Sequence, residues 1–199
     1  MGTQLTPGVD DQSAIMACIG HVCIQWALLE NNILAVLCTC QNVSTEEAAI
    51  LFGGLDMKPR LGMAINLATH HKWHPSLIKR LRSLRTAIDK AKLVDRRNII
   101  VHGVHKASDK AQTFTLYSPR RNGSAQHEDW TILEAHALGV EIHAAGLEAW
   151  AIFEDYGKWK FGDHPPENSQ SQIVTTPPGL LARIKQHFRP RFNHKGRWG

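Results

Sequence analysis

Three side chains that could act together on a phosphodiester lie within one short stretch of the sequence, "DRRNIIVHG", which contains Arg97, Asn98 and His102. An arginine keeps its charge at all accessible pH values, and its forked guanidinium suits a phosphate or the charge that develops on a transferring phosphoryl group. A histidine can accept or donate a proton near neutral pH. The pattern therefore predicts a site for acid–base chemistry at a phosphodiester that needs no metal ion and no cofactor.

A helix that ends at Gly103 must position these residues. On a helix, Arg97 and His102 are separated by about 140° around the axis and by roughly 7.5 Å along it, so only the length of the arginine lets them approach each other. A closed site needs another wall, which a second helix or a second subunit could supply. His102 falls in the last turn, where the helix dipole favours the protonated ring. A purely structural interpretation also stays open, in which His102 caps carbonyl groups and the arginine pairs with Glu30 or Asp95.

The sequence Arg97-Asn98-x-x-x-His102 resembles the signature of the HEPN superfamily of helical domains, in which an arginine and a polar residue precede a histidine by a few positions. In that family the signature lies near the end of a late helix, and "DRRNIIVHG" is similar to that setting. The stretch "IQWALLENNILAVL" also resembles the first helix of bacterial HEPN-like proteins. The resemblance implies that Glu30 faces the helix that carries the motif.

The resemblance implies a metal-independent endoribonuclease, in which two subunits contribute to one composite site. Arg97 would contact the scissile phosphate, His102 would serve as general acid or base, and Asn98 would orient the site by hydrogen bonding. Arg96 could also be the arginine of the motif, although the position of Asn98 directly after Arg97 favours Arg97. Arg96, Asp95 and Glu30 are expected as supporting residues of the site. The products would carry a 2′,3′-cyclic phosphate, because the 2′-hydroxyl of RNA is the nucleophile.

The family resemblance also implies partners and a biological setting. The expected partners are RNA, a second copy of the chain and an antitoxin or other partner protein, in a toxin–antitoxin or defence system, with no membrane. Because some members of the superfamily only bind nucleotides or proteins, the alternative is a non-catalytic helical module that binds a nucleotide, RNA or another protein.

The elements that hold the motif are predicted to be helical. Apolar residues recur at spacings of three and four over residues 11–41, which predicts a central helix that is apolar nearly all round. An interrupted helical stretch should follow over residues 45–71, with breaks near Gly53-Gly54 and near Pro59. A further helix should begin at about Pro75 and continue through the motif to Gly103, a residue that suits the left-handed position after a helix.

Beyond the motif, residues 104–129 predict a two-stranded β-hairpin, and a last helix is expected from about Trp130 to Phe153. The predicted fold is all-α, an antiparallel helical bundle of the HEPN type with this small β-hairpin insertion. The resemblance covers residues 11–156. We expect a helical domain over residues 1–167 and a linker with a basic tail over residues 168–199, where a short helix at most is predicted.

Composition gives the broad class of the protein. The formal charge of +5 comes from the tail, because the segment after Glu167 holds six lysines and arginines and no acidic residue, whereas residues 1–167 sum to −1. All four cysteines lie in the first predicted helix or at its end, which favours reduced thiols that fill the core. His21 and Gln25 interrupt the apolar stretch near the start, which favours a buried helix over a membrane span. The absence of a secretory signal pattern predicts a cytoplasmic protein.

Overall fold

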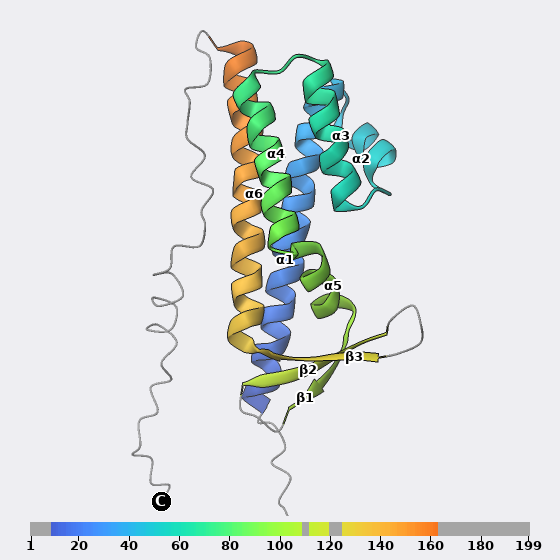
Figure 1. Ribbon diagram of the computed structural model, residues 1–199, viewed down its shortest axis with the longest axis vertical. Helices are drawn as coiled ribbons and strands as arrows, with labels where there is room; N and C mark the ends of the chain where they lie inside the picture. The colour runs from blue at the N-terminus through green and yellow to red at the C-terminus, as the bar shows by residue number, and fades with distance from the viewer. Residues whose placement is uncertain (1–8, 109–111, 120–124, 163–199) are drawn as a thin grey trace, which may run out of the picture.

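The computed structural model describes residues 9–108, 112–119 and 125–162. The described part is mainly helical, as the periodicity predicts, and it also contains a three-stranded antiparallel sheet (Figure 1). The elements are α1 (Val9–Gln41), α2 (Thr45–Phe52), α3 (Met57–His70), α4 (Pro75–Lys90), α5 (Leu93–His102), β1 (Val104–Ala107), β2 (Thr113–Pro119), β3 (Ala125–Thr131) and α6 (Ile132–Phe161). The predicted tail, with its short helix, lies outside the described residues.

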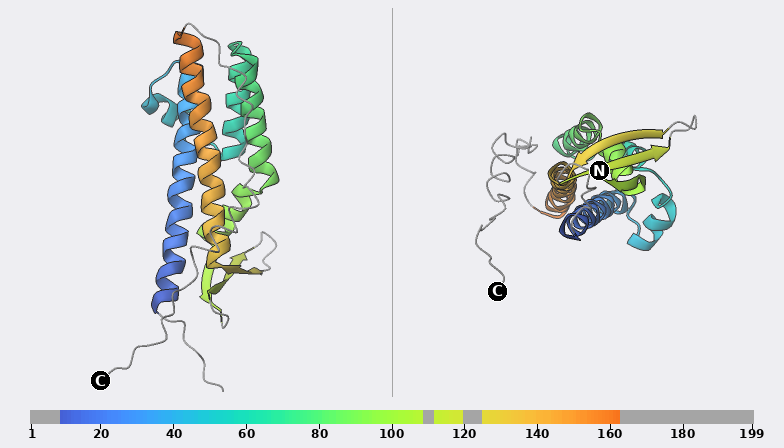
Figure 2. Two further views of the ribbon diagram at one scale, coloured as in Figure 1. Left: turned by 90° about the vertical axis from the view of Figure 1, so that its left-hand side faces the viewer. Right: turned by 90° about the horizontal axis from the view of Figure 1, so that it is seen from below.

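Four helices form a two-layered bundle, with α1 and α6 in one layer and α3 and α4 in the other (Figure 2). Helix α4 runs antiparallel to α6, but α1 and α6 run parallel: Asn32 of α1 donates to the carbonyl of Gly146, and Gln25, two turns earlier, contacts His143. The prediction of an antiparallel bundle is therefore wrong for this pair. The reason is that the chain returns through α4, α5 and the sheet to the lower end of the bundle before α6 begins (Figure 1).

A glycine of α6 makes room for a side chain of α1. The ring of His21 lies directly against Gly139 of α6, where a Cβ atom would come within 2.2 Å of the ring. The same ring stacks on His136, with 5.3 Å between the ring centroids. A larger residue at position 139 would therefore displace the His21 ring from this position.

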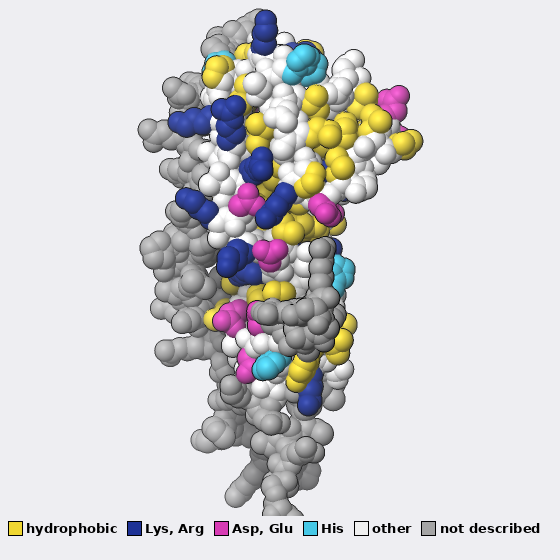
Figure 3. All heavy atoms as spheres, turned by 45° about the vertical axis from the view of Figure 1, so that its right-hand side comes forward, with side chains coloured by type: hydrophobic (Ala, Val, Ile, Leu, Met, Phe, Trp, Pro, Cys, Tyr) yellow, Lys and Arg dark blue, Asp and Glu magenta, His cyan; other side chains and the backbone are white. Residues whose placement is uncertain are grey.

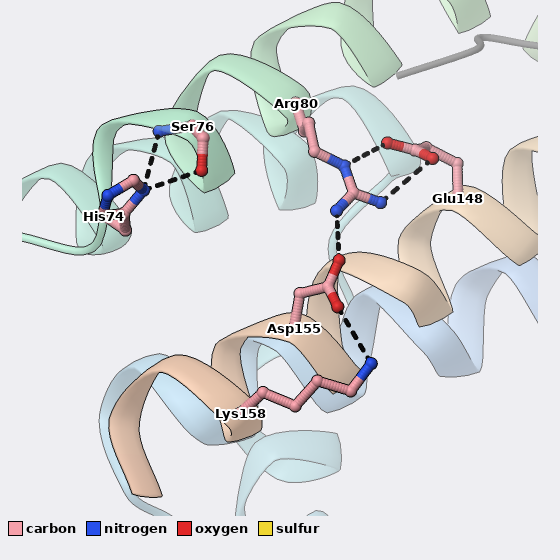
Figure 4. A network of polar contacts seen from close by, with 6 residues as sticks. All are labelled: His74, Ser76, Arg80, Glu148, Asp155 and Lys158. Atoms are coloured by element: carbon pink, nitrogen blue, oxygen red, sulfur yellow. Dashed lines mark hydrogen bonds and ion pairs between the residues drawn. The ribbon is translucent and has the colours of Figure 1, made fainter. Parts of the chain in front are cut away.

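An ion-pair network joins α4 to α6 in the upper half of the bundle (Figure 4). Arg80 donates two hydrogen bonds to Glu148, at 2.8 and 3.2 Å, and one to Asp155 at 2.6 Å. Lys158 also contacts Asp155, at 3.2 Å. The arginine side chain is only 10% exposed, so these two carboxylates satisfy a charge that water hardly reaches.

Helix ends differ in part from the sequence-based expectation. The break after α2 falls at Gly53-Gly54 as predicted, but the second predicted break is wrong, because Pro59 lies in the first turn of α3, where its missing N–H costs little. A break that was not predicted separates α4 from α5 at Lys92, whose φ of 51° is left-handed. Gly103 ends α5 as expected, but its backbone is extended and not left-handed.

The last segment holds one strand more than expected and a longer helix. The sheet order is β1-β2-β3, and β1, which follows α5 directly, pairs with β2 through Val104 and Tyr117. Both Phe114 and Leu116 of β2 are buried, so the sheet covers the lower end of the bundle. Helix α6 begins with a capping box between Thr131 and Glu134 and extends about two turns beyond the predicted end at residue 153.

Helix α1 has the length and apolar composition that a membrane span would need, over residues Gln12–Gln41. The central helix of a helical core and a signal sequence near an N-terminus have the same properties, so this finding is weak evidence for a membrane. One face of α1 contributes Val22, Leu29 and Ile33 to the core, where they are almost fully buried.

Candidate functional site

Helix α5 presents the motif because its apolar face is anchored in the bundle. Leu93 and Ile100 are buried, which leaves Asn98 and His102 on the exposed side of the helix and Arg97 half-buried between the two sides. The lower end of α5 is held by the sheet, since the ring of His105 in β1 hydrogen-bonds the carbonyl of Ile100 at 2.8 Å. The motif therefore lies on a helix that is fixed at its inner face and open at its outer face.

The structure brings the three predicted residues into contact. The Nη1 atom of Arg97 lies 3.1 Å from Nε2 of His102 and donates a hydrogen bond of 2.9 Å to Oδ1 of Asn98. A guanidinium only donates hydrogen bonds, so in this contact Nε2 of His102 is the acceptor and the ring proton lies on Nδ1. The Nε2 lone pair is thus engaged by Arg97, and Nε2 could accept a proton from a substrate once the arginine moves away.

The guanidinium of Arg97 lies over the ring of Trp26 in α1, with 5.4 Å from Cζ to the ring centroid. Its Nε atom is buried and has no hydrogen-bond partner, and among the described residues no carboxylate forms an ion pair with this side chain. A half-buried charge with a spare donor and no counter-ion is costly unless a ligand completes it. The guanidinium of Arg97 therefore has the properties of an anion-binding group, and the indole of Trp26 holds its plane in place.

Arg96 has a different role from Arg97, although the two residues are adjacent. Its guanidinium binds both oxygens of Glu141 in α6, at 2.6 and 3.3 Å, and donates to the carbonyl of Ala91 at 3.3 Å. It also lies 6.0 Å from the ring of Trp130. Arg96 thus fastens α5 to α6, and the structure resolves the open register in favour of Arg97 as the arginine that contacts the histidine.

Two expectations for the supporting residues are not met. Glu30 does not face α5; its carboxylate lies 3.8 Å from Arg60 in α3, and Arg60 in turn donates to the carbonyls of Phe52 and Gly53. Asp95 is exposed and forms no ion pair in the part of the chain that the structure describes. Neither carboxylate therefore neutralises Arg97, and the interpretation in which Glu30 or Asp95 pairs with this arginine does not hold.

Sequence reasoning missed the contribution of Trp26. An inward tryptophan in an apolar helix is normally a core residue, and nothing in its spacing connects it with a motif 71 positions later. The cysteines match the expectation of free thiols, with Cys18 and Cys40 buried and the other two half-buried. Within the described ranges, no three His, Cys, Asp or Glu side chains gather into a group that could hold a metal ion.

Comparison with known proteins finds no counterpart: no family model, no curated protein and no solved structure matches this chain.

Proposed function

We propose that this protein is a metal-independent endoribonuclease of the HEPN type. The observation that carries the proposal is the contact between Nη1 of Arg97 and Nε2 of His102 at the open face of α5, in which the arginine has no carboxylate partner among the described residues. They supply two of the groups that cleavage of RNA by its own 2′-hydroxyl uses, namely a cation for the phosphate and a base for the hydroxyl.

The reaction assigns one task to each side chain. Nε2 of His102 takes the proton from the 2′-hydroxyl, whose oxygen attacks the phosphorus and forms the cyclic phosphate while the bond to the 5′-oxygen breaks. Arg97 exchanges its contact with the histidine for the phosphate oxygens and stabilises the charge that develops on them. Asn98 holds Nη1 of the arginine at 2.9 Å and so orients the fork. The leaving 5′-oxygen takes a proton from a protonated His102, which a second copy of the chain could supply.

A homodimer completes the proposed site, and the surface of α1 supports such a pairing. Residues 12–29 contain no charged side chain, and Met16, Ile24 and Leu28 are exposed large apolar residues on this helix. Cys23 and Ala27 flank the tryptophan on which Arg97 rests. If α1 packs against its own copy at these two small residues, the two copies of Arg97, each of which lies over Trp26, come to lie on either side of the seam. This packing would provide the second wall that one chain lacks.

The biological setting that we propose is a toxin–antitoxin or other defence system in the cytoplasm, where an antitoxin or another partner protein would restrain the nuclease. A protein of the same fold without activity would instead be a helical module that binds a nucleotide, RNA or a protein. The experiment below separates these two possibilities.

The test is cleavage of a single-stranded RNA by the purified full chain in the presence of EDTA, with its all-2′-deoxy analogue as the substrate control. We expect cleavage of the RNA alone, product ends with a 2′,3′-cyclic phosphate, and loss of at least 100-fold in rate for His102→Ala. Asn98→Ala should reduce the rate of cleavage less than His102→Ala does. If the wild-type protein leaves all tested RNAs intact, or if His102→Ala cuts equally well, the non-catalytic module replaces the nuclease.

A further inference from the structure

The charges of this chain are strongly segregated along the sequence. Residues 57–97 contain 11 lysines and arginines against two acidic residues, a net charge of +9, whereas residues 1–56 contain no lysine or arginine and six acidic residues. The proposed catalytic chemistry uses only one of these 11 cations. The other ten positive charges must be balanced either by ion pairs within the fold or by a bound ligand.

Ion pairs within the fold account for about half of them. Arg60, Arg80 and Arg96 each bind a carboxylate of another helix, and both Lys58 and Arg85 contact Asp89. These contacts also use Asp89 of α4 and the carboxylates that α6 places against α4 and α5, which are Glu141, Glu148 and Asp155; among the described residues Asp95 of α5 is exposed and forms no ion pair. The acidic groups around α4 are therefore already engaged by other cations.

Five cations remain; one of them, Lys72, is exposed between α3 and α4, and the other four lie on the solvent side of α4 and at its C-terminal end. Lys79, Arg82 and Lys90 are exposed on α4, and Lys92 is exposed at the turn that leads into α5. We refer to these four residues as the α4 band. In the described part of the chain none of the four forms an ion pair, and Figure 3 shows lysine and arginine side chains gathered along this part of the surface.

The α4 band runs toward the proposed site. Lys79 and Lys90 are about 16 Å apart along the helix, and Lys92 precedes Arg97 by five residues, or roughly 7.5 Å of helical rise. A row of unpaired cations of this length matches a ligand that presents several regularly spaced negative charges, and a polynucleotide backbone is such a ligand. A single phosphate or a nucleotide would engage at most one or two members of the row.

We infer that the α4 band binds the phosphate backbone of single-stranded RNA and guides the strand toward Arg97 and His102. The identity of the polyanion as RNA rests on the proposed function, whereas the location of the surface rests on the charges and their pairing. The contacts are electrostatic and carry no base specificity, so the band should increase the affinity for long substrates without changing the chemical step.

The test compares two double variants with the same change in charge, both in full-length protein that also carries His102→Ala so that RNA stays intact. Lys79→Gln with Arg82→Gln removes two members of the band; Lys106→Gln with Lys160→Gln removes two exposed cations from β1 and α6 that form no ion pair among the described residues, and serves as the matched control. Binding of a fluorescein-labelled 20-nucleotide oligouridylate is followed by anisotropy from 50 to 300 mM KCl. Circular dichroism should give the same spectrum for all proteins, because the substituted side chains are exposed.

We expect the band variant to bind the oligouridylate roughly tenfold more weakly than the His102→Ala parent at 50 mM KCl. The slope of the logarithm of the binding constant against the logarithm of the salt concentration should become less steep by about 1.4, or about 0.7 for each lost phosphate contact. The control variant should bind like the His102→Ala parent. Equal losses in both variants, an unchanged band variant, or a parent that does not bind the oligonucleotide would overturn the inference. So would band-dependent binding to phosphatidylserine vesicles, or band-dependent self-association, in the absence of RNA binding.

A second readout separates this inference from the proposed nuclease. With His102 intact, the band variant should cleave the dinucleotide UpA as fast as wild type, because UpA is too short to reach the band, and should cleave the 20-nucleotide RNA with a reduced kcat/KM. Absence of cleavage by every protein, combined with the expected loss of binding, would refute the nuclease and leave the binding surface. Cleavage of both substrates at wild-type rates would refute the surface and leave the nuclease.

Discussion

The adjacent arginines of α5 allow a sharp test, because the structure gives them opposite tasks. Arg96 makes a two-pronged contact with Glu141, and both side chains are less than a third exposed, at 29% and 28%. Arg96→Gln leaves this carboxylate half-buried without its partner. Charge-assisted hydrogen bonds of this kind contribute about 1.5–3 kcal/mol, so we expect a loss of about 2 kcal/mol in the free energy of unfolding.

Arg97→Gln should behave differently. The substitution removes a cation–π contact with Trp26, worth about 0.5–1 kcal/mol, and two hydrogen bonds to exposed groups. No carboxylate within the described residues loses its partner. We therefore expect a loss of about 1 kcal/mol or less in unfolding free energy, but a fall of at least 100-fold in RNA cleavage.

These magnitudes keep the two measurements independent. A domain of this size is typically stable by about 5–15 kcal/mol, so losses of 1 or 2 kcal/mol leave more than about 99% of either variant folded at 25 °C. Unfolding free energies come from urea titrations followed by circular dichroism, and activities from initial rates on a labelled RNA. The assignment fails if Arg96→Gln loses cleavage as severely as Arg97→Gln, or if Arg97→Gln is the less stable of the two and still cuts RNA.

Burial, and to a smaller extent the neighbouring His136 and His143, lowers the pKa of His21 below its ordinary value of 6.5. The unfolded chain therefore binds the proton more readily than the folded protein, so the free energy of unfolding should fall as the pH drops from 8 to 5.5. Urea titrations at these two pH values should show a smaller fall for His21→Gln than for the wild type. Burial also raises the pKa of the Cys40 thiol to about 12, so a maleimide at pH 7.5 should leave Cys40 unlabelled in the native protein and label it in urea; mass mapping that finds native Cys40 labelled would contradict the packing of α1. Arg80→Met should lower the unfolding free energy by about 3 kcal/mol, because two carboxylates lose the cation they share, and a loss below about 1 kcal/mol would show that water already screens the network.

The sequence predicted most of the helices because their signals are local. The long α1 follows from its apolar periodicity, and the start of α2 from Ser44, which forms a capping box with Glu47. The end of α5 follows from Gly103. Each of these signals depends on residues within one or two turns, so a single sequence is enough to read them.

The features that sequence reasoning missed depend on distant parts of the chain. The break at Lys92 has no glycine or proline to announce it, because the left-handed residue there is a lysine. Strand β1 has only four residues, too few for a pattern of its own, and it forms by pairing with β2. The parallel course of α1 and α6 likewise results from the path of the intervening segments and not from either helix.

The candidate site shows the same division. The contact among Arg97, Asn98 and His102 lies within one helix, and the type and spacing of the residues were enough to single it out. The direction in which each arginine points depends on Trp26 and Glu141, which belong to other helices. Glu30 was assigned wrongly for the same reason, since its partner Arg60 is fixed by the packing of α3 on α1.

The short length of α5 has a consequence for how the site could lose its shape. A helix of ten residues between a left-handed residue and a strand is too short to persist by itself, so it depends on the burial of Leu93 and Ile100. The four longer helices bury more side chains against one another, so we expect α5 to open as a small cooperative unit while the bundle stays closed. Hydrogen exchange would detect such an opening as weak protection of the α5 amides beside strong protection in α1. A ligand that binds only the closed form would slow hydrogen exchange in α5, and a tighter ligand would slow it more. A partner that binds only the opened α5 would inactivate the site without unfolding the bundle.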